Sequence, residues 1–217
     1  MRTRVNKFLI ADDHLIVRTG LKTIIKEMSP FADFDEAVNG DQVIGFIKNN
    51  DYDMVILDIN MPETDSIALV SNLFAYKENS RVLIFSMNAE SLYAKRFLKL
   101  GVLGYLDKES EASEIRKAIE NVMSGTAYMS ENLKRYFYED MMARRTDNPF
   151  EKLSNREIQV AKYLLQGYSH AEIQKTLNLH SSTVGTHKLR FFEKLKIRNI
   201  FELRELAKLY QIDILKM

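Results

Sequence analysis

The sequence predicts two domains of different classes: an α/β domain with a five-stranded parallel sheet, followed by a small all-α domain of four helices. Three observations support this prediction. Short apolar runs alternate with amphipathic helical patterns up to about residue 125, whereas only helical patterns follow residue 150. The charge changes sign, from four excess acidic residues over 1–130 to five excess basic residues over 151–217. The length of 217 residues fits two small domains.

Five runs in the first part have the length and composition of strands. Residues 7–11, 54–57 and 82–85 are nearly continuous apolar runs, which are typical of strands buried on both faces of a sheet. Residues 34–38 form a weaker candidate because they include acidic residues, and Gly104 interrupts the run 102–106. Helical spacing of apolar residues lies between and after these runs, around 17–28, 41–48, 67–74, 90–100 and 115–122. Right-handed crossovers then favour a flavodoxin-like (βα)5 order.

The composition excludes several classes of protein. The chain has no cysteine, which excludes a disulfide scaffold, a cysteine-ligated zinc site and a thiol nucleophile. Its longest apolar runs have the length of a strand, and the basic N-terminus is not followed by a secretory hydrophobic stretch. We therefore expect a soluble cytoplasmic protein with no membrane partner.

Polar side chains follow the predicted strands at the point where each strand ends. Asp12 and Asp13 follow the first strand, Asp58 the third, Ser86 the fourth and Lys108 the fifth. Because the carboxyl ends of parallel strands share one edge of the sheet, we expect these side chains to meet there. Three carboxylates in one pocket call for a divalent cation, and oxygen ligands suit Mg²⁺. A metal ion and an ammonium group around one carboxylate make a site for a transferred phosphoryl group.

Each of these residues, taken singly, has a simpler interpretation. Asp12, Asp13 and Ser86 have side chains that commonly cap helix N-termini, and Lys108 has the character of an ordinary solvent-exposed lysine. The coincidence of all five at one predicted edge favours the site.

The second part predicts a helical DNA-binding unit. Ser154 and Glu157 form a capping-box pattern, and helices are expected from there to Gly167, from Ser169 to Leu177, from residues 181–182 to 195, and from about 199 to 210. The tight turn between the second and third helices is typical of a helix-turn-helix. Candidate DNA contacts lie on or near the third helix: Ser182, Thr183, Thr186, His187, Lys188, Arg190 and Lys194. A merely solvent-facing charged helix is the alternative.

The first part resembles the receiver domain of bacterial two-component response regulators. The resemblance lies in Ala11-Asp-Asp-His14, Asp58-Ile-Asn-Met-Pro62, Phe85-Ser86 and Gly104-Tyr-Leu-Asp-Lys108. It implies that Asp58 accepts a phosphoryl group from a sensor histidine kinase. The implied Mg²⁺ ligands are Asp13, Asp58 and the backbone carbonyl of Asn60, with Asp12 acting through water. Lys108 would pair with the acyl phosphate, Ser86 would bond a phosphate oxygen, and Tyr105 would follow Ser86 inward.

The second part resembles the LuxR-type helix-turn-helix, and the whole chain resembles the NarL/FixJ class of response regulators. The motifs are Leu153–Glu157, Gly167–Ser169, Glu172-Ile173, Thr183–His187 and Lys194-Leu195. The class implies a receiver domain (1–125) and a DNA-binding domain (150–217). The linker between them (126–149) loses the alternation of strands and helices, and the aromatic and charged residues from Glu131 to Arg145 predict a helix in it. It also implies binding to double-stranded DNA as a homodimer, with Ile200 to Leu209 as a candidate dimer surface.

Three positions depart from the family pattern: Ser66 follows Asp65 where glycine is usual, Gly185 replaces a usual Lys or Arg, and Leu189 stands where a polar residue is common. We expect Ser66 to alter a loop without disabling the site. A regulator that binds DNA without phosphorylation stays an alternative. A phosphatase is disfavoured because Asn60 stands where a second carboxylate would act, so no enzyme is expected. The cognate kinase, the operator and the direction of regulation stay open.

Overall fold

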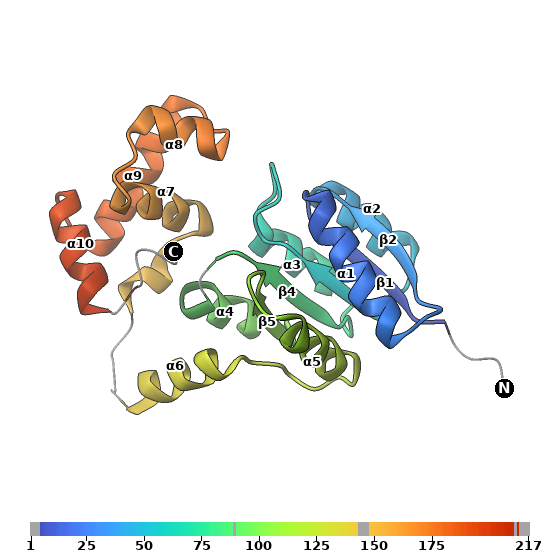
Figure 1. Cartoon of the computed structure of the whole chain (residues 1–217). Helices are drawn as coiled ribbons and strands as arrows, with labels where there is room; N and C mark the ends of the chain where they lie inside the picture. The colour runs from blue at the N-terminus through green and yellow to red at the C-terminus, as the bar shows by residue number, and fades with distance from the viewer. Residues whose placement is uncertain (1–4, 89, 143–147, 211, 213–217) are drawn as a thin grey trace. The chain divides into compact units, whose positions relative to one another are not determined.

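The computed structural model describes residues 5–88, 90–142, 148–210 and 212, and these form two compact units (Figure 1). The first unit holds five strands: β1 (Lys7–Ala11), β2 (Asp33–Ala37), β3 (Met54–Leu57), β4 (Val82–Ser86) and β5 (Gly104–Asp107). Its helices are α1 (Leu15–Met28), α2 (Gly40–Asn49), α3 (Ser66–Tyr76), α4 (Glu90–Lys99) and α5 (Ala112–Met123). Within the described residues, no helix is long and apolar enough to cross a membrane.

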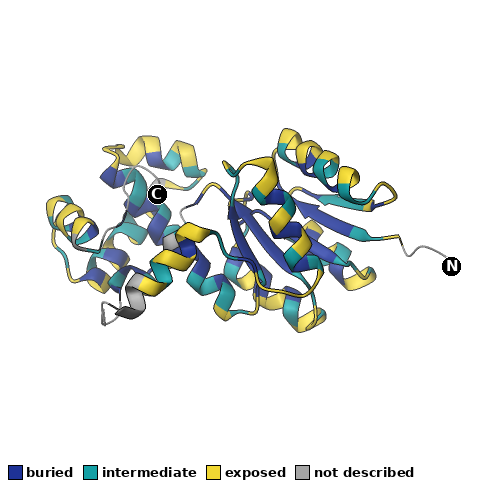
Figure 2. Cartoon of the chain, turned by 60° about the horizontal axis from the view of Figure 1, so that its bottom comes forward, coloured by how far each residue is buried: buried dark blue, intermediate teal, exposed yellow. Residues whose placement is uncertain are grey.

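The five strands form one parallel sheet in the order β2-β1-β3-β4-β5. This is the flavodoxin-like order, so the predicted α/β class is confirmed. Helices α1 and α5 cover one face and α2, α3 and α4 the other (Figure 1). Strands β1, β3, β4 and β5 are mostly coloured as buried in Figure 2, whereas the edge strand β2 is mostly intermediate. The three apolar runs supply the core on both faces of the sheet.

Strand β5 begins later than the sequence predicts, at Gly104 rather than Val102. The amide of Val102 donates to the carbonyl of Phe97 (3.2 Å), so this residue closes the turn after α4 instead of joining the sheet. A Cβ on Gly104 would lie 2.8 Å from Leu83 Cδ1, which explains why glycine occupies this crowded position.

The chain returns to the sheet after α5. Tyr128 forms an isolated parallel bridge with Gly104, its amide donates to Leu103 (2.7 Å), and its side chain lies in the core. The Ser130 hydroxyl bonds Glu90 and accepts from the Leu133 amide at the start of α6 (Glu131–Met142). A helix is therefore present in the predicted linker; its predicted extension beyond residue 142 lies outside the described residues.

The second unit contains a short 3-10 helix, η1 (Pro149–Lys152), and then α7 (Asn155–Leu165), α8 (His170–Leu177), α9 (Ser181–Leu195) and α10 (Ile200–Leu209). Ser154 makes the reciprocal capping box that the sequence predicts, and Ser169 makes a second one at the start of α8. Asn178 adopts a left-handed conformation that ends α8 before the turn to α9. The predicted all-α unit of four helices is confirmed.

Candidate functional site

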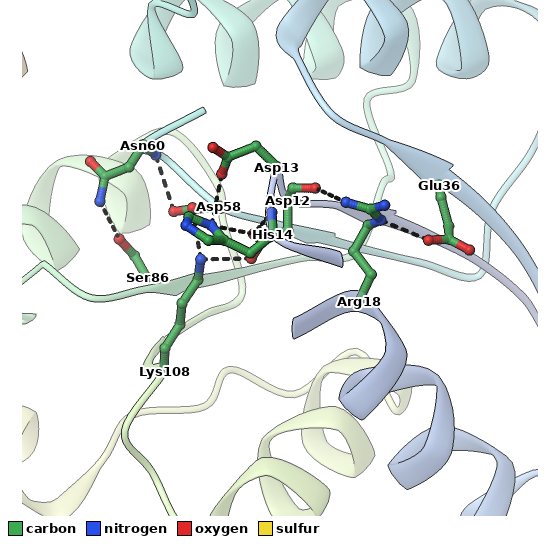
Figure 3. A network of polar contacts seen from close by, with 9 residues as sticks. All are labelled: Asp12, Asp13, His14, Arg18, Glu36, Asp58, Asn60, Ser86 and Lys108. Atoms are coloured by element: carbon green, nitrogen blue, oxygen red, sulfur yellow. Dashed lines mark hydrogen bonds and ion pairs between the residues drawn. The ribbon is translucent and has the colours of Figure 1, made fainter. Parts of the chain in front are cut away.

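Acidic and basic side chains meet at the carboxyl edge of the sheet, as the sequence predicts (Figure 3). The ammonium of Lys108 lies 2.6 Å from Asp12 Oδ2 and 2.8 Å from Asp58 Oδ2. The side chains of both aspartates are only 2% exposed, and that of Lys108 is 8% exposed. The Lys108 ammonium therefore bridges two carboxylates that directly follow the adjacent strands β1 and β3.

The environment of Asp58 is set by burial and by Lys108. Burial raises the pKa of Asp58, and the neighbouring ammonium partly opposes that rise. For Lys108, burial favours a lower pKa, but attraction to the two carboxylates outweighs burial and raises the pKa. The amide of Asn60 donates to Asp58 Oδ1 (3.0 Å), which fixes one carboxylate oxygen while Lys108 holds the other.

A group of amide and hydroxyl side chains lies beside Asp58. Ser86 is fully buried, and its Oγ accepts from Asn60 Nδ2 and from the Asn88 amide, each at 3.3 Å. Asn88 Nδ2 donates to Asn60 Oδ1 (2.8 Å), and the Asn88 carbonyl accepts from the hydroxyl of buried Tyr105 (3.0 Å). Tyr105 is therefore linked to the site through Asn88, a residue that the sequence did not single out.

Four residues could hold a metal ion: Asp12, Asp13, His14 and Asp58, whose ligand atoms all lie within 4.8 Å of one another. Asp13 is on the exposed side of the cluster, and the His14 imidazole Nδ1 lies 2.9 Å from Asp13 Oδ1 and 3.2 Å from Asp12 Oδ1. Three carboxylates from two strand ends match the oxygen ligands of a hard divalent cation. The residues present thus fit a metal centre.

Arg18 and Glu36 support the first strand end, and sequence reasoning missed both. Arg18 Nη1 donates to the backbone carbonyl of Asp12 (2.7 Å), and Arg18 Nε lies 2.6 Å from Glu36 Oε2 on β2 (Figure 3). Hydrogen bonds from Lys22 and Arg18 lower the pKa of Glu36. No local motif identifies this contact, because it depends on the register between β1 and β2.

The loop in which Ser66 departs from the family pattern still provides an N-cap for helix α3. Asp65 caps α3 by accepting from the amides of Ile67 (3.0 Å) and Ala68 (3.1 Å), and Ser66 is buried. The charged residues of the site lie at the strand ends, as the sequence predicts, although Ser66 replaces the usual glycine in this loop.

The predicted contact residues of α9 divide into two groups. Ser182, Thr186 and Arg190 are exposed, and Thr183 is partly exposed. His187 and Lys188 are partly buried, and the exposed Lys194 forms an ion pair within the unit. Lys194 Nζ lies 2.7 Å from Glu157 Oε2, and Lys188 Nζ lies 5.4 Å from the centre of the Phe192 ring.

His187 is partly buried. Its Nδ1 is buried and has no hydrogen-bond partner among the described residues, and burial lowers its pKa.

Comparisons with known proteins match both units. A family model described as the response regulator receiver domain matches residues 8–120, and one described as bacterial regulatory proteins, luxR family, matches residues 151–207. The Fimbriae Z protein of Salmonella typhimurium is 30% identical, over 94% of this chain and 97% of its own. Response regulator UvrY of Escherichia coli is 28% identical, over 92% of each chain.

Solved structures are similar as well. RcsB from Salmonella enterica serovar Typhimurium, bound to a promoter in the presence of the phosphomimetic BeF3−, is 22% identical and has a TM-score of 0.61. The similarity covers 94% of this chain and 98% of that chain. At this identity the likeness shows the fold.

Proposed function

Because the chain belongs to the response regulators, with a receiver domain and a LuxR-family regulatory domain, we propose that Asp58 is the acceptor of a phosphoryl group from a sensor histidine kinase. The observation that carries this proposal is the bridge of Lys108 to Asp12 and Asp58 in a buried, acidic strand-end site. An acyl phosphate on Asp58 would place new negative charge beside an ammonium group that is already positioned and largely shielded from water.

Mg²⁺ is the metal that best fits the proposed reaction. The carboxylates of Asp13 and Asp58 and the backbone carbonyl of Asn60 would hold the ion, with Asp12 acting through water. When bound, Mg²⁺ supplies positive charge that neutralises the oxygens of the transferred group.

The side chains around Asp58 have distinct roles in this proposal. Lys108 pairs with the phosphoryl group, and the Asn60 amide keeps one Asp58 oxygen in place. The Ser86 hydroxyl accepts two hydrogen bonds, so its own proton is available to donate to a phosphate oxygen. Movement of Ser86 would alter its bond to the Asn88 amide, and Asn88 also accepts from Tyr105. The site can thus bias a two-state switch.

The second unit is proposed to bind double-stranded DNA through α9, as a homodimer when active. The exposed residues Ser182, Thr186 and Arg190, the partly exposed Thr183 and the exposed Phe201 of α10 (71%) support this assignment. We assign residues 1–125 to the receiver, 126–149 to the linker and 150–217 to the DNA-binding domain, in a cytoplasmic transcriptional regulator.

Phosphorylation of the purified chain tests the proposal. With acetyl phosphate and Mg²⁺, the wild type should gain one phosphoryl group by intact-protein mass, and Asp58→Asn should gain none. Asp51→Asn is the control, because the Asp51 side chain is 91% exposed and paired only with Lys77 in the described contacts. Label retained on Asp58→Asn would refute the assignment.

Control of DNA binding by phosphorylation needs its own measurement. We expect BeF3− with Mg²⁺ to raise the affinity of the wild type for duplex DNA and to leave Asp58→Asn unchanged. Equal affinity of the wild type with and without BeF3− would favour the phosphorylation-independent regulator instead.

A further inference from the structure

Helix α9 has a buried face and an opposite, outward face. Val184 and Phe191 are fully buried and Leu195 is 6% exposed, so these residues anchor α9 in the core. At about 100° per residue, the opposite face carries Ser182, Thr186, Leu189 and Glu193. All four of these residues are exposed.

Leu189 is the apolar residue among these four. Leu189 is 67% exposed, so its apolar side chain is available for contact with a partner. Gly185 precedes it by one turn, and a Cβ built there would meet no atom within 4 Å. The Thr186 hydroxyl donates to the Ser182 carbonyl (2.8 Å), so its proton is already used. Neither Leu189 nor Gly185 can make a side-chain hydrogen bond to a base edge.

The positive charges of α9 lie to the side of Leu189. Arg190 is exposed beside the outward face, whereas Lys188 lies along the Phe192 ring and Lys194 is paired with Glu157. Cations at the margin of a helix suit phosphate contacts, and the central residues of its outward face are those that reach the base edges.

We propose that Leu189 is a specificity-determining residue that contacts the C5-methyl group of a thymine, with Gly185 leaving room for close approach. The thymine methyl is the apolar group that base pairs present in the major groove, and apolar side chains recognise it by contact. This inference rests on the proposed function, because it requires α9 to enter the major groove.

The experiment begins with the full-length protein. Sequences are selected from random duplex DNA with BeF3− and Mg²⁺ present, and each thymine of the selected site is then replaced by deoxyuridine, which lacks the methyl group. For the wild type, a single replacement at one position of a half-site should weaken binding about fourfold, the effect expected when contact with one methyl-sized group is lost. For Leu189→Ala, thymine and deoxyuridine should bind equally at that position.

Two further variants sharpen the comparison. Ile16→Ala is the matched control, because Ile16 is an 85% exposed aliphatic residue of the first unit and should keep the thymine preference. Leu189→Lys should lose the thymine preference and steepen the salt dependence of binding by about one phosphate contact. Circular dichroism checks that each variant keeps its helices.

The outcomes separate the inference from the function. Failure of the wild type to bind any duplex would refute the proposed DNA binding. DNA binding that is insensitive to deoxyuridine at every position would overturn the role of Leu189 and leave the function standing. A thymine preference that survives in Leu189→Ala or in Leu189→Lys would also overturn the role of Leu189.

Discussion

Removal of the bridging cation at the acidic site should destabilise the first unit in the absence of metal. In Lys108→Met, the buried carboxylates of Asp12 and Asp58 lose the ammonium that lies 2.6 and 2.8 Å from them. Methionine keeps much of the apolar stem, so the change removes mainly charge. Breaking a buried ion pair from one side costs about 3–5 kcal/mol. For a domain of this size, that loss lowers the melting temperature by about 10–20 °C.

The loss of unfolding free energy in Lys108→Met should depend on pH, and the protonation of Asp58 determines whether it grows or shrinks as the pH rises. Burial raises the pKa of Asp58, and Lys108 opposes that rise. Without Lys108, the folded-state pKa lies further above the unfolded value, so the folded state takes up a proton more readily as the pH falls. The deficit in the free energy of unfolding of Lys108→Met should therefore be larger at pH 8 than at pH 5.

Hydrogen exchange read by mass spectrometry is the suitable assay, because it reports the stability of the two units separately. Lys117→Met is the control, since Lys117 is 54% exposed and its change should stay within about 0.5 kcal/mol. Mg²⁺ at 100 times its dissociation constant should restore about 2.7 kcal/mol to Lys108→Met. A loss below about 1 kcal/mol at pH 8 without metal would contradict the role given to the bridge.

Three other substitutions test packing and charge, each by urea denaturation. Burial favours a higher pKa for Glu157, but bonds from Lys194 and the Ser154 amide outweigh it and lower the pKa. Glu157→Gln should cost the second unit about 1–2 kcal/mol at pH 7, and the deficit should shrink as acid protonates the wild-type carboxylate; a constant deficit down to pH 3 would contradict the ion pair. Gly104→Ala should cost about 1–3 kcal/mol, because its Cβ would lie 2.8 Å from the Leu83 side chain. Gly45→Ala, in an open helical position, should add about 0.5–1 kcal/mol; destabilisation there would show that the helix needs glycine.

The strands and the acidic edge of the sheet can be predicted from local sequence patterns alone. Apolar runs such as Met54–Leu57 predict buried parallel strands, and parallel order brings their polar ends together. By sequence alone, strand β2 is a weak candidate, because its acidic residues are unfavourable for a strand by themselves. It forms because Asp35 pairs with Lys7 on β1 (2.8 Å) and bonds the Tyr52 hydroxyl (2.6 Å), contacts that require the tertiary register.

The contacts of α9 could not be predicted from spacing alone. The sequence identifies Lys194 and His187 as polar residues on a basic helix, and this pattern is as consistent with contacts to DNA as with contacts inside the unit. Packing of α9 against α7 places the Lys194 ammonium on buried Glu157 and buries His187 Nδ1. The angle at which two helices cross determines which of their polar residues meet, and this angle depends on the packing of the whole core. The two family matches confirm the predicted class of regulator, whereas the individual site residues stay predictions.

The outer strands of the sheet have a consequence for self-association. Strand β2 carries Asp33, Asp35 and Glu36 along one border, and the segment around Tyr128 bonds to the opposite border at Leu103 and Gly104. Charged side chains and covering segments are the means by which proteins discourage strand addition from a neighbouring molecule. Continuation of the sheet from one chain to the next is thereby disfavoured, so two copies that associate through this unit are left to do so by their helix surfaces.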